Sequence, residues 1–292
     1  MKIENVLIVG AGWVGRQIAA RMVFRGLTVT LLDKDPLALS SSVEWIATQA
    51  TKNAEGDAER PVAWASSLHT IEDLNQVDAS ADVDLALECA PEQLSIKRRL
   101  LKRLSETFGK STIVASNSSY FVPSLFSPYL VHRERYAHVH FHVPVMHDSV
   151  SDICGHEGTD PLVLENLKDL VERLGLEPLM LRKEHPGYVF NWMLQSLLKS
   201  ALELVASDVV DVEDVDLSWK KVTGMPIGPF GIMDQIGIDV VEQVMANSRW
   251  AEELPDQSEK ILQLLREKTN AGKLGTKSGE GFYSHEDEHE LQ

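Results

Sequence analysis

Three glycines near the N-terminus have the spacing of a turn that binds phosphate groups. The apolar run Asn5–Val9 predicts a strand buried on both faces, and Gly10, Gly12 and Gly15 follow it directly. In such a turn the first glycine permits the tight bend, the second lets a pyrophosphate approach the backbone, and the third lets the next helix pack closely. The glycines therefore predict a binding site for a dinucleotide cofactor.

A helix and a carboxylate complete this pattern. Trp13 and Val14 open the predicted helix, whose unpaired N–H groups would face the phosphates. The next apolar run, Thr28–Leu32, predicts a strand that ends at Asp33. A carboxylate at that position binds the ribose diol of NAD and repels the 2′-phosphate of NADP, so the sequence favours NAD. The neighbouring Lys34 weakens this preference.

Two polar clusters at the ends of later predicted strands could carry out chemistry. Ser116–Ser119 follows the apolar run 112–115, and His140 lies at the end of the run 137–141. Ligands of an open parallel sheet bind beyond the carboxyl ends of its strands, so both clusters are expected near the cofactor. A nicotinamide enzyme that oxidises an alcohol needs a base for the hydroxyl proton, and the pKa of histidine suits this task. A nearby hydroxyl would hold the reacting oxygen, and a carboxylate would orient the imidazole.

The histidines of this stretch leave the choice of base open on spacing alone. Five of them lie close together in the sequence, namely His132, His138, His140, His142 and His147. His138, His140 and His142 share one face of the predicted strand, so alternation does not separate them. They could also hold a metal ion, but no carboxylate or cysteine completes a familiar ligand spacing, and we predict no metal site.

The composition narrows the partners and the compartment. The chain has 292 residues and a formal net charge of −16, which argues against binding to nucleic acid or to an anionic membrane. No apolar run has the length of a membrane span, and we expect no signal peptide. Cys89 and Cys154 have no metal or redox spacing, which favours a reducing, cytoplasmic compartment. We expect a small-molecule substrate.

The order of the predicted elements indicates an α/β fold with two domains. Strand and helix patterns alternate in the first part, as in a doubly wound parallel sheet of Rossmann type. Short strands are expected at 62–65 and 82–89, and a helix from Pro91. The later pattern is helical, in runs near 188–206, 213–221, 233–247 and 258–269. We therefore predict an NAD-binding domain over 1–185, a smaller all-α domain over 186–284 and an acidic, disordered tail over 285–292. Helical domains in this position often dimerise, so we expect a homodimer.

Three further motifs resemble those of the L-3-hydroxyacyl-CoA dehydrogenases, and the resemblance covers nearly the whole chain. Ser116–Ser119 is similar to the family motif Ser-Asn-Thr-Ser, and His140–Pro144 is similar to His-Phe-Phe-Asn-Pro. Pro186–Asn191 is similar to Pro-Gly-Phe-x-x-Asn. The glycine turn and two later segments, 224–230 and 277–283, are also similar to family signatures.

The resemblance implies a role for particular residues. It makes His140 the catalytic base, Ser119 the catalytic hydroxyl and Asn191 the active-site asparagine of the helical domain. Asp152 stands in place of the family's catalytic glutamate, which would orient the base. Further cofactor contacts implied by the resemblance fall on Glu92, Lys97 and Lys277, and Ser119 is expected to contact the cofactor as well.

Three departures from the family pattern bear on the substrate. Val143 stands where the family has an asparagine that contacts cofactor and substrate. This polar contact is therefore missing or comes from another group such as His142. Asp152 is one methylene shorter than glutamate. The family's CoA-binding serine and lysine fall near Gln49 and Gly56, and neither residue matches.

The resemblance implies NAD-dependent oxidation of a short-chain 3-hydroxyacyl-CoA, such as 3-hydroxybutyryl-CoA, to the 3-ketoacyl-CoA by hydride transfer. The acidity of the chain and the unmatched CoA contacts leave a second hypothesis, a dehydrogenase of a small free hydroxy acid like carnitine or gulonate. A third hypothesis is a catalytically idle NAD-binding protein, motivated by Val143 and the shorter carboxylate.

Overall fold

The computed structural model describes residues 2–54, 64–77, 82–147, 149–247 and 255–285. The chain divides into two compact units, Met1–Val189 and Phe190–Gln292. The domain boundary after residue 185, expected from the sequence, stays a prediction.

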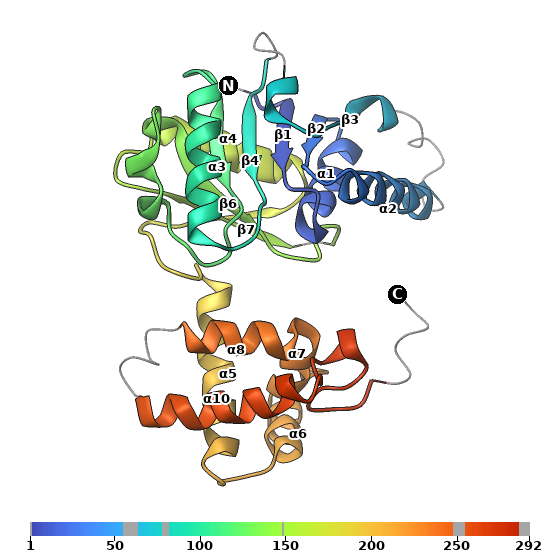
Figure 1. Cartoon of the computed structure of the whole chain (residues 1–292), viewed down its shortest axis with the longest axis vertical. Helices are drawn as coiled ribbons and strands as arrows, with labels where there is room; N and C mark the ends of the chain where they lie inside the picture. Colours follow the sequence, from blue (N-terminus) through green and yellow to red (C-terminus); the bar gives the residue numbers. More distant parts are fainter. Residues whose placement is uncertain (1, 55–63, 78–81, 148, 248–254, 286–292) are drawn as a thin grey trace. The chain divides into compact units, whose positions relative to one another are not determined.

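The first unit is built on one eight-stranded sheet with the order β3-β2-β1-β4-β5-β6-β7-β8 (Figure 1). Strands β1 to β6 are parallel, whereas β7 is antiparallel to β6 and parallel to β8. The strands are β1 Asn5–Val9, β2 Thr28–Leu32, β3 Leu68–Ile71, β4 Leu85–Glu88, β5 Ile113–Ser116, β6 Tyr136–Phe141, β7 Val150–Gly155 and β8 Glu177–Met180.

Helices cover both faces of this sheet, as the predicted doubly wound fold requires. They are α1 Trp13–Phe24, α2 Pro36–Ala54, α3 Leu94–Thr107 and α4 Pro161–Arg173. Residues of α1, α2 and α4 share one hydrophobic core with the sheet, and residues of α3 share a second core on its other face. Each core leucine or isoleucine that is fully buried in these layers stabilises the fold by about 1.5–3 kcal/mol.

The structure differs from the sequence expectations in three places. Trp64 and Ala65 lie in a turn and a short 3₁₀ helix, and the strand of this region is β3, a few residues later; residues 62 and 63 lie outside the described part. The helix expected from Pro91 begins at Leu94. Strands β7 and β8 and helix α4 were not predicted, because Ser, Asp and Gly interrupt the apolar run of β7, and Glu and Pro occupy half of β8.

The second unit is entirely helical in its described residues, apart from short turns and isolated bridges. Its helices are α5 Phe190–Ala206, α6 Val212–Thr223, α7 Pro229–Ile236, α8 Ile238–Ala246 and α10 Pro255–Asn270 (Figure 1). The run expected over 233–247 is divided between α7 and α8, because Gly237 adopts φ +100, which ends the first helix. Side chains of α5, α7, α8 and α10 form the core, including Leu202, Phe230 and Leu265.

A buried carboxylate organises the C-terminal end of this unit. Asp234 accepts backbone hydrogen bonds from Phe282 (2.8 Å) and Tyr283 (2.9 Å) and pairs with Nε2 of His285 (2.9 Å). The expected acidic tail lies, after His285, outside the described residues. No described helix has the length and apolar character needed to cross a bilayer.

Candidate active site

The glycine turn between β1 and α1 has the geometry that its sequence predicts. Gly10 adopts φ +116, a conformation that L side chains rarely take. A Cβ on Gly15 would lie 1.9 Å from the carbonyl oxygen of Gly10, so only glycine lets α1 pack this closely. A Cβ on Gly12, by contrast, would meet nothing within 4 Å, which leaves open space over the turn.

A cleft of about 930 Å³ lies over this turn. Eight of the residues predicted to take part in the site line it, namely Gly10, Gly12, Trp13, Val14, Asp33, Glu92, Lys97 and Ser119. They come from the ends of β1 and β2, from the start of α1, from the segment before α3, from α3 itself and from the loop after β5. The open glycine surface and the size of the cleft fit a dinucleotide.

Asp33 is fixed at the end of β2 by backbone donors. Its Oδ2 accepts from the N–H of Ala11 (2.8 Å) and its Oδ1 from the N–H of Asp35 (3.1 Å). The half-buried carboxylate therefore keeps one orientation at the rim of the cleft, where the sequence predicts a contact with a ribose diol. Arg103 also lines the cleft and pairs with Asp73 (3.2 Å).

Trp13 belongs to a small aromatic stack at the mouth of the turn. This residue is 55% exposed, and its ring meets the ring of Trp45 edge to face at 5.9 Å. The guanidinium of Arg16 lies 4.5 Å from the centroid of Trp13 and 5.0 Å from that of Trp45. These cation–π contacts hold Trp13 at the cleft although the residue is exposed.

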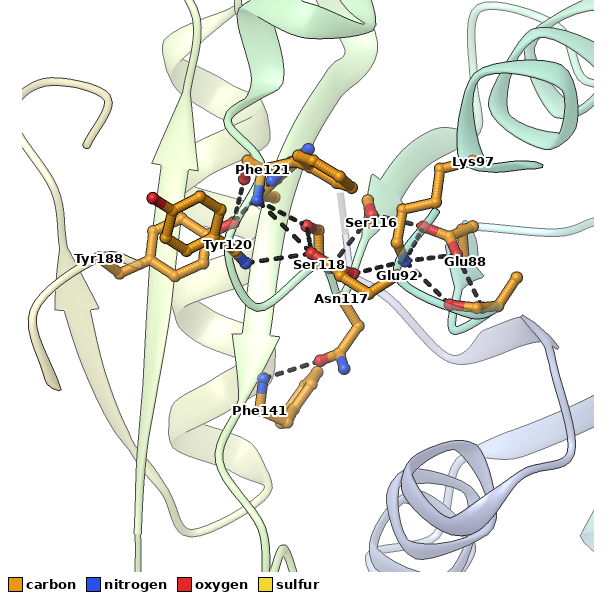
Figure 2. A network of polar contacts seen from close by, with 12 residues as sticks. Glu88, Glu92, Lys97, Ser116, Asn117, Ser118, Tyr120, Phe121, Phe141 and Tyr188 are labelled. Carbon is orange, nitrogen blue, oxygen red and sulfur yellow. Dashed lines mark hydrogen bonds and ion pairs between the residues drawn. The ribbon is translucent and has the colours of Figure 1, made fainter. Parts of the chain in front are cut away.

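A buried ion cluster supports Glu92 (Figure 2). Nζ of Lys97 contacts Oε1 of Glu88 (2.8 Å), Oε2 of Glu92 (3.2 Å) and the carbonyl oxygen of Ala90 (3.0 Å). Burial lowers the pKa of Lys97, but the two carboxylates outweigh it and raise the pKa above its usual value. Lys97 is only 1% exposed, so its ammonium is committed to these protein oxygens while part of the side chain lines the cleft.

Glu92 in turn organises the loop that follows β5. It accepts hydrogen bonds from the Ser118 hydroxyl and from the N–H of Tyr120 (3.1 Å), as Figure 2 shows. Asn117 accepts from the N–H of Phe141 (2.8 Å), which ties the loop to the end of β6. Ser119, between these anchored residues, is exposed and lines the cleft.

His140 and Asp152 are brought together by the antiparallel pairing of β6 and β7, in which they are direct partners. Nδ1 of His140 lies 3.2 Å from Oδ2 of Asp152. The same oxygen lies 2.8 Å from Nε2 of His142, which directly follows the end of β6. With an ionised carboxylate as acceptor, each of these ring nitrogens donates, and Nε2 of His140 is left as the acceptor of a proton.

The protonation states follow from this environment. Burial lowers the pKa of His140; the hydrogen bond to Asp152 opposes this, and the neighbouring His142 adds to the lowering. For Asp152, burial alone would raise the pKa, but the hydrogen bonds from the two imidazoles bring it below its usual value. A neutral imidazole on an ionised carboxylate is the state that a general base requires.

A second network, which the sequence did not reveal, lies directly behind His140. The ring of Tyr188 stacks on that of His140 at 5.3 Å and 27°. The Tyr188 hydroxyl donates to the carbonyl oxygen of Phe121 (3.1 Å) and contacts Nδ1 of His138 (2.7 Å), whose Nε2 meets the hydroxyl of Tyr136 (2.6 Å). Burial holds the pKa of His138 well below its usual value, so this imidazole stays neutral inside the network. The alternation of side chains along β6 placed His138 on this face, but only the structure separates it from His140.

Two predicted site residues lie in the second unit. Asn191 is half-buried near the start of α5. Lys277 is exposed and forms an ion pair with Asp239. Their roles at the catalytic or cofactor site stay predictions. Gln49, near which the family's CoA-binding serine is expected by counting, is half-buried on α2, and Gly56 lies outside the described residues.

Within the described part of the chain, one group of side chains has the arrangement of metal ligands. Ligand atoms of His140, His142 and Asp152 lie within 4.8 Å of one another. In the sequence no carboxylate stands at a familiar metal-ligand spacing from these histidines. In the structure, Asp152 on the neighbouring strand β7 takes that place. Both histidine nitrogens that face Asp152 are engaged in hydrogen bonds with it.

Comparison with known proteins gives a consistent result over the whole chain. The family model for the NAD-binding domain of 3-hydroxyacyl-CoA dehydrogenases matches residues 5–185, and the model for the C-terminal domain of the same family matches residues 187–285. A 5-formyl-3-hydroxy-2-methylpyridine 4-carboxylate 5-dehydrogenase of Mesorhizobium japonicum is 30% identical over 96% of this chain and 90% of its own length.

Solved structures agree with these sequence matches. The structure of a diketoreductase is 31% identical, with a TM-score of 0.86, over 97% of this chain and 99% of the other. That of an (S)-3-hydroxybutyryl-CoA dehydrogenase from Ralstonia eutropha is 26% identical, with the same TM-score and coverage. The predicted family, the Rossmann-type fold and the NAD cofactor are thereby confirmed. This chain belongs to the 3-hydroxyacyl-CoA dehydrogenase family, whose members are NAD-dependent oxidoreductases acting on CH–OH groups.

Proposed function

We propose that this protein oxidises the 3-hydroxyl group of a short-chain 3-hydroxyacyl-CoA to the ketone, with His140 as the general base. The observation that carries the proposal is the pairing of His140 with the buried Asp152 at the end of β6, beside a loop that lines the cofactor cleft. The hydrogen bond to Asp152 fixes Nδ1 as the protonated nitrogen and leaves Nε2 to accept the hydroxyl proton. Asp152 then stabilises the imidazolium that forms.

The other residues of the site bind and orient. Ser119, exposed at the cleft, would hold the reacting oxygen, and the family resemblance implies that Asn191 also takes part in catalysis. Gly10, Gly12 and the N-terminus of α1 would bind the pyrophosphate of NAD, and Asp33 would bind its ribose. NAD, when bound, supplies the hydride acceptor of the reaction. Lys97 holds Glu92 in place through an ion pair, and Glu92 holds the serine loop through its hydrogen bonds.

The acyl-CoA substrate is supported by the family model and by the likeness to a 3-hydroxybutyryl-CoA dehydrogenase. A second candidate is a small free hydroxy acid. Three observations favour it. The net charge is −16, and Gln49 does not match the family's CoA-binding serine. The chain is also similar to a dehydrogenase of a pyridine carboxylate and to a diketoreductase. Both candidates use the same proton transfer by His140.

One set of assays tests the proposal. His140→Ala should lower kcat by about two to four powers of ten, the usual contribution of general acid–base catalysis, while binding of NAD stays within about threefold. A kcat near the original value in this variant would contradict the proposal.

A substrate comparison separates the two candidates. Initial rates with 3-hydroxybutyryl-CoA, free 3-hydroxybutyrate, carnitine and gulonate, in both directions, should give the highest kcat/KM for the thioester. The second candidate is supported if a free acid is preferred. Binding of NAD without turnover of any substrate would instead support a catalytically idle protein.

We also propose that the protein is a homodimer that associates through its helical unit. Met193 on α5 and Val222 on α6 are large apolar side chains with 58% and 84% of their surface exposed. Such residues at an interface lose this contact with water on association. Light scattering should give twice the mass of the chain, and a Met193→Glu, Val222→Glu variant should be monomeric; a monomeric unmodified protein would contradict the proposal.

A further inference from the structure

We propose that His142 is a positioning residue of the catalytic site, which holds the short Asp152 side chain in place for His140. This inference rests on the proposed role of His140 as the base. The site as the sequence suggests it contains one imidazole and one carboxylate. The structure contains two imidazoles on a single carboxylate oxygen.

The sheet register explains how the three groups meet. His140 is the direct cross-strand partner of Asp152, so their side chains leave the same face of the sheet. His142 lies two residues beyond His140, directly after the end of β6, and its imidazole reaches the same carboxylate oxygen. The distance from Oδ2 of Asp152 is 2.8 Å to His142 and 3.2 Å to His140, so the carboxylate is held more tightly by His142 than by the base itself.

Without a second hydrogen-bond donor, the carboxylate of Asp152 would have too few partners for a buried charge. Its side chain is completely buried, and its Oδ1 has no hydrogen-bond partner among the described residues. A buried carboxylate with a single 3.2 Å hydrogen bond would be costly, because a charge removed from water must be compensated by close donors. In the family motif the position of His142 is a phenylalanine and that of Asp152 is a glutamate. The extra donor therefore accompanies the shorter carboxylate.

The second imidazole also acts on the charge of the base. The groups that face His140 are Asp152 on β7, His142 directly after β6, the ring of Tyr188, and Glu92 at longer range. Among them, His142 opposes a positive charge on His140, whereas the two carboxylates favour it. Loss of His142 should thus make His140 easier to protonate, which shifts the acidic limb of the pH–rate profile to higher pH.

Two substitutions separate the hydrogen bond from His142 to Asp152 from the effect of the His142 charge on His140. His142→Phe removes both, and His142→Gln keeps an N–H donor near the position of Nε2 but cannot be protonated. In His142→Phe we expect kcat/KM at the pH plateau to fall about tenfold, the equivalent of one buried hydrogen bond. In His142→Gln the plateau should stay within about threefold. In both variants the acidic limb should move upward by about one pH unit, because the second imidazole is gone.

The matched control is His147→Phe, which removes an exposed imidazole of the same segment. Its plateau and acidic limb should equal those of the unmodified enzyme. NMR titration of the His140 imidazole in the enzyme without NAD provides a readout that does not depend on turnover. A His140 titration and a pH–rate profile that are both unchanged in His142→Phe would overturn the inference. If His140→Ala keeps full activity while the His140 titration still responds to His142→Phe, the proposed base is wrong and the positioning contact is correct.

A double-mutant cycle tests the link to the shorter carboxylate. In the Asp152→Glu background the longer side chain can approach His140 without help, so adding His142→Phe should lower kcat/KM by less than about threefold. The same tenfold loss in both backgrounds would show that His142 acts independently of Asp152 and would contradict the proposal.

Discussion

The two units each contain a fully buried aspartate that meets a histidine, and the two carboxylates are satisfied in different ways. Asp234 in the helical unit accepts from two backbone N–H groups and from His285, and both of its oxygens are used. Asp152 in the sheet unit accepts only from imidazoles, and both meet the same oxygen. Its other oxygen has no partner among the described residues.

The difference separates a carboxylate that maintains the fold from one suited to chemistry. Two of the three donors to Asp234 are backbone N–H groups, which do not titrate, so these hydrogen bonds hold Phe282 and Tyr283 in place over the pH range in which imidazoles change charge. Imidazoles do change charge near neutrality, so the environment of Asp152 responds to a proton. A buried polar atom without a partner is rare in a structural site and is more often found where function requires it.

The largest expected effect comes from removing the negative charge of Asp152. Asp152→Asn should lower kcat/KM by about two to four powers of ten, because an amide can donate to Nδ1 of His140 and so stabilise the wrong tautomer. The melting temperature should change by only a few degrees. Steady-state kinetics and thermal unfolding on the same sample test this, and a loss of less than threefold in kcat/KM would remove Asp152 from the mechanism.

The same substitution at Asp234 should lower the stability of the fold and leave cofactor binding and the pH profile unchanged. Asp234→Asn should destabilise the helical unit by about 3 kcal/mol, because one oxygen that accepts from a buried backbone N–H becomes a donor. NAD affinity and the acidic limb of the remaining activity should not change. Chemical denaturation measures the first quantity and titration with NAD the second. A stable Asp234→Asn protein with a shifted pH profile would invalidate the contrast between the two aspartates.

The pH dependence of the unmodified enzyme is the next expected effect. His140 must be unprotonated to accept the hydroxyl proton, and its pKa is lowered from the usual 6.5 by burial. The acidic limb of oxidation should therefore be centred below pH 6.5. A pH series of kcat/KM tests this prediction, with thermal unfolding at each pH as the control for stability. An acidic limb centred above pH 7 would contradict it.

The smallest expected effect is that of chelation. The two imidazole nitrogens nearest Asp152 already donate to it, so we expect the reaction to need no metal at this cluster. Dialysis against EDTA should change kcat by less than about 20%. A larger loss that Zn²⁺ restores would indicate that His140, His142 and Asp152 act as ligands, as their separations would permit.

The cofactor cleft was largely predictable from the sequence, because its determinants are local. The distances among Gly10, Gly12 and Gly15 are set by one turn, and Asp33 is placed by the strand that it ends. The network behind His140 was not predictable. It depends on the register of β6 against β7 and on the return of the chain to Tyr188, and a distant pairing of this kind leaves no local pattern. Alternation placed His138, His140 and His142 on one face of the predicted strand, but their different partners were visible only in the structure.

The stack of Trp13, Arg16 and Trp45 gives this protein an optical property of practical use. An exposed indole at the mouth of the dinucleotide cleft should be quenched when a reduced nicotinamide arrives, since the emission of tryptophan overlaps its absorption. The intrinsic fluorescence of the chain would then report occupancy directly in every variant, including those that are catalytically dead. Replacing Trp13 by phenylalanine would show how much of that signal arises at the cleft.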